Sequence, residues 1–337
     1  MRITARFSKP ISLSPSQPRR LLSLCAVLLI TFTAVLAHAQ DYTSIVVFGD
    51  SLSDTGNFAD LTQAKYLVRI PGPDVNYTDG RFTDGDDTLP MAQKYFGVWI
   101  EQFAALLPSK PLIKSSLDGG TNYAYGDARN GNGTTTVTLG ASLSVNVNNI
   151  GQQVADYLAT SPGINDQTLF AIWGGANDVL DATSPDDVVK GVIAQLINIQ
   201  HLIDAGATQF IIPNLPPLGS TPAFIGSPAD GAAATAGSVL YNQLLSEGLS
   251  ILRVINRGKH LHLVQLDIFS LFNHIVASPA EYALTNVDAP AQGDATIDPD
   301  TYLFWDDLHP TTRGHNIVAV TALGAFSTVT CGLPCSK

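Results

Sequence analysis

Ser51 stands where a serine side chain could act as a nucleophile. It follows the apolar residues 44–48 after only Gly49 and Asp50, and open α/β sheets place their sites at the carboxyl ends of such strands. A hydroxyl is a poor nucleophile at neutral pH, so it needs a base in contact. Serine is also a common helix cap. The position alone therefore favours a cap over a nucleophile.

Residues near the other end of the chain could complete this chemistry. His309 can accept the Ser51 proton, and Asp306 or Asp307 could accept the second imidazole proton and hold the ring in one tautomer. Taken singly, His309 fits a loop histidine near a helix N-terminus, and either aspartate fits a solvated acid. The chemistry requires distant segments to meet.

The letters around Ser51 are far more specific than its position. Residues 48–57 read FGDSLSDTGN, which resembles the extended first block of the GDSL/SGNH hydrolases nearly letter for letter. Segments resembling further parts of the family pattern follow along the chain: residues 77–82 (YTDGRF, from the lipase-like branch), 122–126 (NYAYG), 174–178 (GGAND) and 306–310 (DDLHP). The blocks span most of the chain, which on this resemblance is identified as a GDSL/SGNH hydrolase.

The resemblance implies a catalytic triad. Ser51 would be the nucleophile and His309 its base. In this family the acid stands three residues before the histidine, which selects Asp306 and not Asp307. The choice between the two aspartates rests on the resemblance alone.

The resemblance also implies an oxyanion hole for the negative oxygen of the tetrahedral intermediate. Its donors would be the backbone N–H of Ser51, the backbone N–H of Gly126 and the side-chain amide of Asn177. Glycine permits close backbone approach, and an amide donates without a competing charge. One position departs from many relatives, because Asp127, followed by Arg129, replaces a second glycine. The charge beside the site is therefore left open.

Other kinds of site are disfavoured. His260 and His262 could share a strand face, but no third metal ligand is evident. Asp50, Asp54 and Asp60 lack the spacing of a calcium loop. The chain has no Gly-x-Ser-x-Gly elbow and no glycine-rich nucleotide loop. We expect neither a metal nor a cofactor.

Alternating strand and helix patterns predict the scaffold that positions these residues. Apolar runs predict buried strands at residues 44–48, 168–173, 209–213 and 260–266. Helical spacing predicts helices at residues 98–107, 148–159, 186–205, 232–256 and 311–326, the last opened by Pro310. We expect the other residues between 66 and 140 to form mostly loops. The alternation indicates a three-layer α/β/α sandwich around a mostly parallel sheet of about five strands, flavodoxin-like as in SGNH hydrolases.

Residues 1–39 have the pattern of a signal peptide. Basic residues precede an apolar run at residues 21–36, which ends in small residues flanking His38. The run is short for a membrane anchor. We expect cleavage after Ala39, secretion, and a single hydrolase domain over residues 40–337, because the proposed catalytic residues come from both ends of that segment.

The net charge restricts the partners that the protein could bind, and the cysteines indicate one possible disulfide. Cleavage would remove five of the 18 Lys and Arg and none of the 29 Asp and Glu, changing the net charge from −11 to about −16, which repels nucleic acid. No other apolar stretch reaches membrane length, so we expect a soluble monomer. Cys331 and Cys335 would pair as a local staple in an oxidising compartment. Asn76 and Asn132 begin glycosylation triplets if the host is eukaryotic.

Together these patterns predict a secreted, cofactor-free serine hydrolase that forms an acyl-enzyme at Ser51. An esterase or lipase acting on acyl lipids or short-chain esters comes first, prompted by residues 77–82. A carbohydrate esterase that removes acetyl groups from plant polysaccharide or oligosaccharide is the alternative. A catalytically silent binding protein on the same fold is the second alternative, and the intact triad counts against it.

Overall fold

The structure is a computed structural model that describes residues 41–329, apart from residues 73–75, 79, 86–94, 141–142, 161–162 and 295. Internal contacts divide the chain into residues 1–38 and residues 39–337. Everything described belongs to the second unit. The expected signal peptide and the expected Cys331–Cys335 pair lie outside the described residues.

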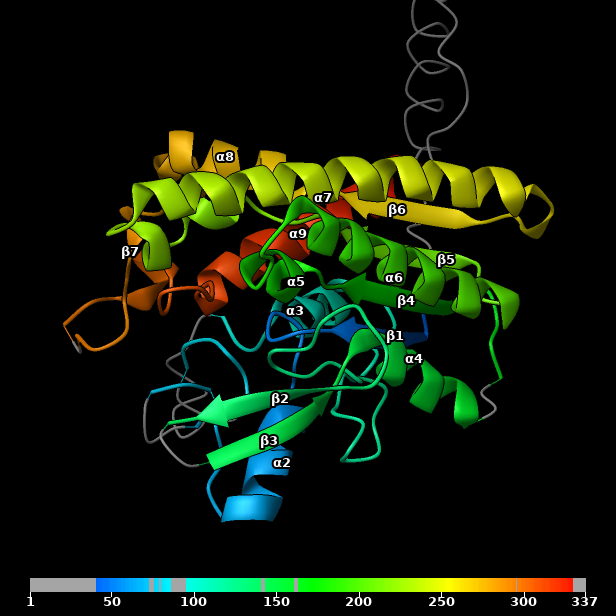
Figure 1. Cartoon of the computed structure of the whole chain (residues 1–337), viewed down its shortest axis with the longest axis horizontal. Coiled ribbons are helices and arrows are strands. Elements are labelled where there is room, and N and C mark those ends of the chain that lie inside the picture. The colour runs from blue at the N-terminus through cyan, green and yellow to red at the C-terminus, as the bar shows by residue number, and fades with distance from the viewer. Residues whose placement is uncertain are drawn as a thin grey trace, which may run out of the picture. The chain divides into compact units, whose positions relative to one another are not determined.

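A parallel sheet of four strands forms the centre of this unit (Figure 1). Its order is β1 (Ser44–Gly49), β4 (Thr168–Trp173), β5 (Gln209–Pro213) and β6 (His262–Leu266). All three pairings are parallel, and nearly every residue of β1, β4 and β5 is buried. The continuous apolar runs therefore form strands covered on both faces, as predicted.

Residues 121–125 add a fifth, shorter segment along the outer edge of β1. The Val47 N–H donates to the Thr121 carbonyl at 3.0 Å, and the Val47 carbonyl accepts from the Tyr123 N–H at 2.8 Å. The pairing is parallel. With this segment the spatial order matches that of flavodoxin-like sheets, and the predicted number of about five strands is accounted for.

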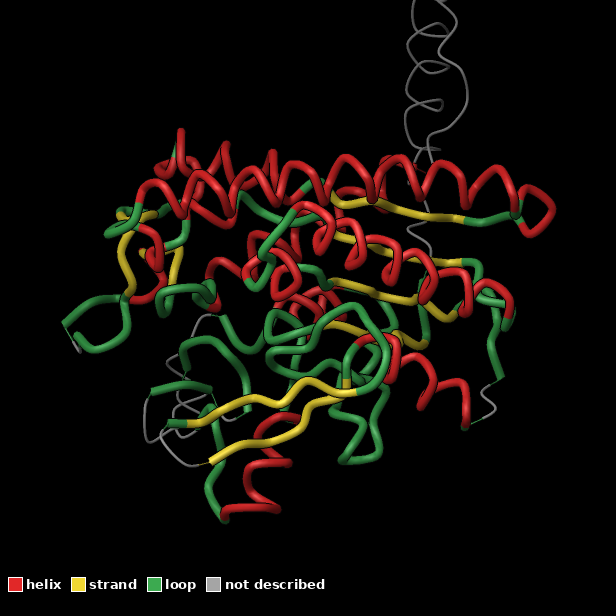
Figure 2. Tube along the Cα trace, in the orientation of Figure 1, coloured by secondary structure: helices red, strands yellow, loops and turns green. Residues whose placement is uncertain are grey.

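Helices cover both faces of the sheet (Figures 1 and 2). One face carries α4 (Ile150–Ala159), α6 (Pro185–Asp204) and α7 (Pro228–Ile255), and the other carries α3 (Trp99–Leu106) and α9 (Thr312–Val329). Successive side chains of β1 point to opposite faces of the sheet. Val46 and Phe48 pack in the core under α4, α6 and α7, whereas Ile45 and Val47 pack in the core under α3 and α9. The predicted three-layer α/β/α sandwich is confirmed.

Two predicted helix starts are displaced. The helix α7 begins at Pro228, ahead of the predicted start, because proline suits the first turn of a helix. Pro310 was expected to open the last helix, and this prediction is wrong. That helix begins at Thr312, and the Thr311 Oγ1 accepts the Gly314 N–H at 3.1 Å as its cap.

Several elements were not predicted. They are α2 (Asn57–Tyr66), α5 (Ala176–Leu180), α8 (Ile268–Ala277), the antiparallel pair β2 (Thr134–Leu139) and β3 (Leu143–Asn148), and the parallel pair β7 (Asn286–Pro290) and β8 (Tyr302–Phe304). A helix was predicted at residues 148–159, but its first residue, Asn148, is instead the last residue of β3. Within the described ranges, no helix combines the length and apolar character that a membrane crossing needs.

Candidate active site

Ser51 lies in a tight turn directly after β1. The Asp50 carbonyl accepts the N–H groups of Ser53 and Asp54, both at 3.0 Å. The Asp50 Oδ1 also accepts the Leu52 N–H at 3.1 Å. These bonds fix the backbone on both sides of Ser51, which leaves its half-buried side chain at the carboxyl edge of the sheet.

Ser51, His309 and Asp306 form one continuous hydrogen-bonded line. The Ser51 Oγ lies 2.9 Å from His309 Nε2, and His309 Nδ1 lies 2.7 Å from Asp306 Oδ2. The other carboxylate oxygen, Asp306 Oδ1, accepts the backbone N–H groups of Leu308 at 2.8 Å and His309 at 2.7 Å. Asp307 is exposed, and among the described residues its side chain has no contact with the imidazole. The structure therefore brings the three predicted triad residues together.

Two aromatic residues from the loop at residues 76–85 contact this line. The Tyr77 hydroxyl donates to Asp306 Oδ2 at 2.7 Å, and the Phe82 ring centroid lies 5.1 Å from that of the His309 ring. Sequence reasoning used residues 77–82 only as a family signal and gave neither residue a part in the site. Tyr77 therefore contacts the acid of this line, and Phe82 contacts its imidazole.

Nearby charges control the ionisation of the triad. Burial alone would lower the pKa of His309, but the Asp306 carboxylate, with smaller contributions from Asp50 and Asp127, raises it above its usual value. Burial also opposes ionisation of Asp306, yet His309 and the two backbone N–H groups hold the Asp306 pKa well below its usual range. Burial raises the pKa of Asp50 to about 7, against the opposing Leu52 N–H.

Two of the three predicted oxyanion donors lie at the same pocket as the triad. Ser51 and Asn177 both line it, together with His309. The Ser51 N–H donates to no group among the described residues. Asn177 Nδ2 donates to the Ala128 carbonyl at 3.0 Å, which leaves the second amide hydrogen for another acceptor.

Gly126, the third predicted oxyanion donor, does not lie at this pocket. It is not among the described residues that line the pocket, and its N–H donates to Asp54 Oδ2 at 2.9 Å. A Cβ at Gly126 would meet the Phe82 ring at 2.4 Å, so glycine is required here for packing. The next residue, Asp127, lines the pocket at a φ of 61°. Its N–H has no acceptor within the part of the chain that the structure describes.

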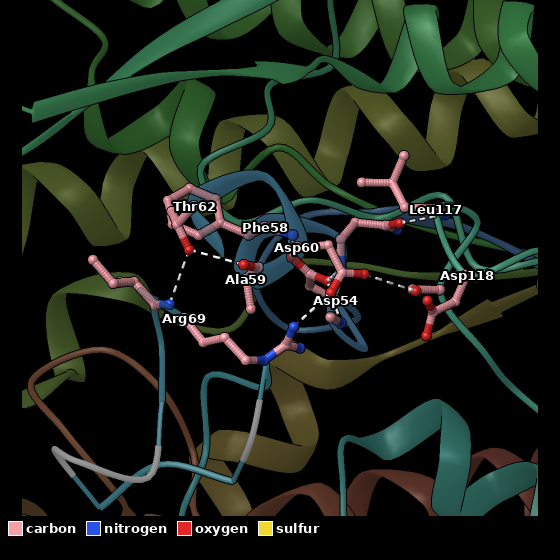
Figure 3. Close-up of polar contacts among 12 residues, drawn as sticks. Asp54, Phe58, Ala59, Asp60, Thr62, Arg69, Leu117 and Asp118 are labelled. Atoms are coloured by element: carbon pink, nitrogen blue, oxygen red, sulfur yellow. Dashed lines mark hydrogen bonds and ion pairs between the residues drawn. The ribbon is translucent and has the colours of Figure 1, made fainter. Parts of the chain in front are cut away.

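Asp54 ties the nucleophile turn to the Gly126 segment. It is fully buried and accepts four backbone N–H groups, those of Gly56, Asn57, Phe58 and Gly126. Beside it, the Thr62 hydroxyl donates to the Ala59 carbonyl at 2.9 Å, and Arg69 pairs with Asp60 at 2.7 Å (Figure 3). These contacts hold α2 and its flanking loop against the turn that carries Ser51.

The topology explains why these groups converge. Ser51 follows β1, Asp127 follows the 121–125 segment, and Asn177 follows β4. These three strands are neighbours and parallel, so their carboxyl ends lie at one edge of the sheet. At the last of them, Gly175 has a φ of 106°, and a Cβ there would meet the Tyr241 ring at 2.3 Å. Glycine therefore allows the sharp exit from β4 that places Asn177.

A match to a known family agrees with this geometry. The sequence model of the GDSL-like lipase/acylhydrolase family matches residues 45–320, most of the chain. The chain belongs to this family. The matched residues include Ser51, Asn177, Asp306 and His309.

Relatives of this GDSL family member come from bacteria, plants and fungi. A thermolabile hemolysin of Vibrio parahaemolyticus is 25% identical over 297 residues, which cover 82% of this chain and 62% of the relative. A GDSL esterase/lipase of Arabidopsis thaliana is 24% identical over 351 residues, 86% of each chain. An acetylesterase of Thermothelomyces thermophilus is 26% identical over 296 residues, 84% of this chain and 87% of the relative. The chain spans about half to two thirds of the length of some bacterial relatives (51% and 62%).

The remaining sequence candidates are not among the described residues that line the pocket beside Ser51. His260 precedes β6 in a left-handed conformation, whereas His262 lies on the strand with Nδ1 3.2 Å from Gln209 Oε1. Among the residues described, no three His, Cys, Asp or Glu side chains gather in a way that could hold a metal ion. Asn76 and Asn132 are both exposed, and their glycosylation stays a prediction.

Proposed function

We propose that this protein is a serine hydrolase that cleaves carboxylic ester bonds through an acyl-enzyme at Ser51. The observation that carries the proposal is the line of contacts from Ser51 Oγ through His309 to Asp306, at 2.9 and 2.7 Å. Both distances suit proton transfer within a nucleophile, base and orienting acid. Membership of the GDSL-like lipase/acylhydrolase family supports the same chemistry.

In the first half-reaction, the Ser51 hydroxyl gives its proton to His309 Nε2 while Oγ attacks the ester carbonyl carbon. The imidazolium then returns this proton to the leaving alcohol, and the acyl group stays on Oγ. In the second half, water gives a proton to Nε2 and attacks the acyl carbon. The imidazolium then returns this proton to Ser51 Oγ as the bond between Oγ and the acyl carbon breaks, which releases the acid and restores the Ser51 hydroxyl. Asp306 holds His309 in the tautomer with hydrogen on Nδ1 throughout.

The oxyanion would be held by three donors, with one change from the sequence assignment. The Ser51 N–H and the Asn177 amide keep their proposed parts. The N–H of Asp127 takes the part first given to Gly126, because the Gly126 N–H already serves Asp54 at 2.9 Å whereas Asp127 lines the pocket. Such donors stabilise the negative oxygen more than the neutral carbonyl, which lowers the barrier.

Acyl esters are the first substrate class that we propose, in line with the relatives named esterase and lipase. Deacetylation of carbohydrate is the second candidate, and the relative named acetylesterase favours it. The third reading, a silent binding protein, does not explain why a complete Ser51–His309–Asp306 line is retained. We also propose that the chain is secreted, from the signal pattern of residues 1–39.

Covalent labelling tests the proposal. The purified protein should hydrolyse p-nitrophenyl butyrate, and an organophosphonate should modify Ser51, located by peptide mass spectrometry. Ser51→Ala should lose labelling and turnover together, whereas Ser250→Ala, an exposed serine on α7, should keep both. Modification at another residue, or turnover that survives Ser51→Ala, would overturn the assignment.

A further inference from the structure

We infer that the pocket beside Ser51 is an acyl-chain site, and that the preferred substrates are esters of medium-length, unbranched fatty acids. The inference rests on the proposed ester hydrolysis and adds the substrate class to it. It is carried by the lining of the pocket, which has a cavity volume of about 100 Å³.

The polar side chains of the pocket belong to its reacting end. Apart from Trp173, whose indole N–H is buried without a partner, the described lining has six polar residues. Five of them are the proposed machinery and its immediate neighbours: Asp50, Ser51, Asp127, Asn177 and His309. The sixth, Thr221, donates its hydroxyl to the Leu218 carbonyl at 2.8 Å, so its polar group is already paired. An ester carbonyl placed at Ser51 would find all of its polar partners at this end.

Most of the remaining lining is apolar, and much of it comes from α8 and β8, which sequence reasoning did not predict. The helix α8 contributes Ile268, Leu271, Phe272 and Ile275, which recur at the spacing of one helix face. The strand β8 adds Phe304, and Gly314 and Val318 of α9 face the same space. Ile268, Phe272 and Ile275 are at most 7% exposed, so the wall is packed from behind.

This lining suits a hydrocarbon chain and opposes a sugar. A sugar ring brings several hydroxyl groups, and each one buried without a partner costs binding free energy. Beyond the proposed machinery, the described lining offers a sugar only the Thr221 hydroxyl oxygen as an acceptor and the buried Trp173 indole N–H as a donor. A methylene chain needs no such partner and gains from each group that leaves water. The sugar or glycerol of any substrate would therefore remain on the alcohol side, outside this pocket.

The helix gives a rough length for the chain. From Ile268 to Ile275, the lining positions of α8 span about 10 Å at about 1.5 Å per residue, the reach of roughly eight extended carbons. Burial of each methylene favours transfer from water by about fourfold. The specificity constant should therefore rise with acyl length to about eight carbons and fall once the chain exceeds the wall.

The decisive experiment compares kcat/KM for p-nitrophenyl acetate, butyrate, hexanoate, octanoate, laurate and palmitate, with acetylated xylo-oligosaccharide as a further arm. We expect octanoate to exceed acetate at least about 10-fold and palmitate to fall below octanoate. Acetate as the best ester, or acetylated oligosaccharide cleaved faster than octanoate, would overturn the acyl-chain site. Because acetate hydrolysis and Ser51 labelling would persist in either case, ester hydrolysis itself would stand.

Two variants locate the acyl chain, and a third serves as a control. Leu271→Trp, at a half-buried lining position on α8, should lower the octanoate-to-acetate ratio by about 10-fold or more. Val276→Trp makes the same change on the same helix at an exposed position outside the lining, and should leave the ratio unchanged. Ile275→Ala lengthens the space and should move the optimum toward laurate. Equal ratios in the wild type and Leu271→Trp would place the acyl chain elsewhere.

Discussion

At the scale of single residues, the site is governed by the charges that surround one imidazole. His309 is hydrogen-bonded to Asp306, Asp127 adds further negative charge nearby, and Asp50 does so once the pH exceeds its raised pKa of about 7. An imidazolium is stabilised by such neighbours, so the proton leaves His309 at a higher pH than from a free histidine. A base must be neutral to accept the Ser51 proton. Activity should therefore respond to each of these charges.

The pH profile should show this directly. We expect kcat/KM for a short ester to rise with pH, with its midpoint above the usual histidine value, because the pKa of His309 is raised. Asp127→Asn removes a negative charge and keeps the backbone N–H, so it should move the midpoint to lower pH. Asp288→Asn, at an exposed position on β7, is the matched control. A midpoint that Asp127→Asn leaves in place would show that this charge does not act on His309.

The Asn177 amide offers a second test at this scale. Asn177→Ala should reduce kcat by about 100-fold or more with a small change in KM, because the donor acts mainly on the transition state. Asn177→Asp should be at least as damaging, since it replaces the donor with a negative acceptor. Steady-state kinetics on p-nitrophenyl butyrate measures both. A loss confined to KM would assign Asn177 to substrate binding alone.

At the scale of elements, a buried carboxylate joins the first block of the sequence to the second. Asp54 stands at the start of α2 and accepts three N–H groups there, and its fourth donor, Gly126, comes from the segment beside β1. The turn that presents Ser51 and the loop that presents Asp127 are thus held by one side chain.

The stability of the protein should depend on Asp54. Asp54→Ala would leave four buried N–H groups without an acceptor, so we expect the free energy of unfolding to fall by about 3 kcal/mol or more. The neighbouring Asp60 pairs with Arg69 at a partly exposed position, and Asp60→Ala should cost about 1 kcal/mol or less. Urea denaturation compares the two. Equal losses would contradict the structural role given to Asp54.

At the scale of the whole molecule, the chain must bring Ser51 and His309 together across a separation of 258 residues. The central sheet achieves this by collecting the ends of its strands at one edge, while β8 and the loop before α9 deliver Asp306 and His309. The first described strand begins at Ser44, shortly after the expected cleavage site. Every described residue of the sheet and of the proposed triad lies after that site.

Export should leave this unit intact. When the full chain is produced in a host with a secretory signal peptidase, we expect the protein in the medium to begin at Gln40 and to hydrolyse p-nitrophenyl butyrate. N-terminal sequencing of the secreted material identifies the first residue. Recovery of active protein only from the cell membrane, with Met1 retained, would contradict cleavage and favour an anchor.

Much of this architecture followed from local pattern. Buried parallel strands read as continuous apolar runs, and helices as residues at helical spacing, because each pattern records which side of a segment meets water. The same patterns missed β2 and β3, which are rich in threonine, serine and asparagine and lie in a stretch rich in turn-forming residues. They also missed α8, which is short and follows β6 after one residue.

The sequence by itself determined the family, the layered fold and the identity of Ser51, His309 and Asp306 as candidates, because those depend on residue type and order. Only the tertiary structure decided which backbone N–H groups remain free to donate a hydrogen bond at the pocket. It gave the Gly126 N–H to Asp54, placed Tyr77 on Asp306 and built an apolar wall beside the serine. Such partners come from segments far apart in the chain, and the packing that joins them produces no local sequence pattern.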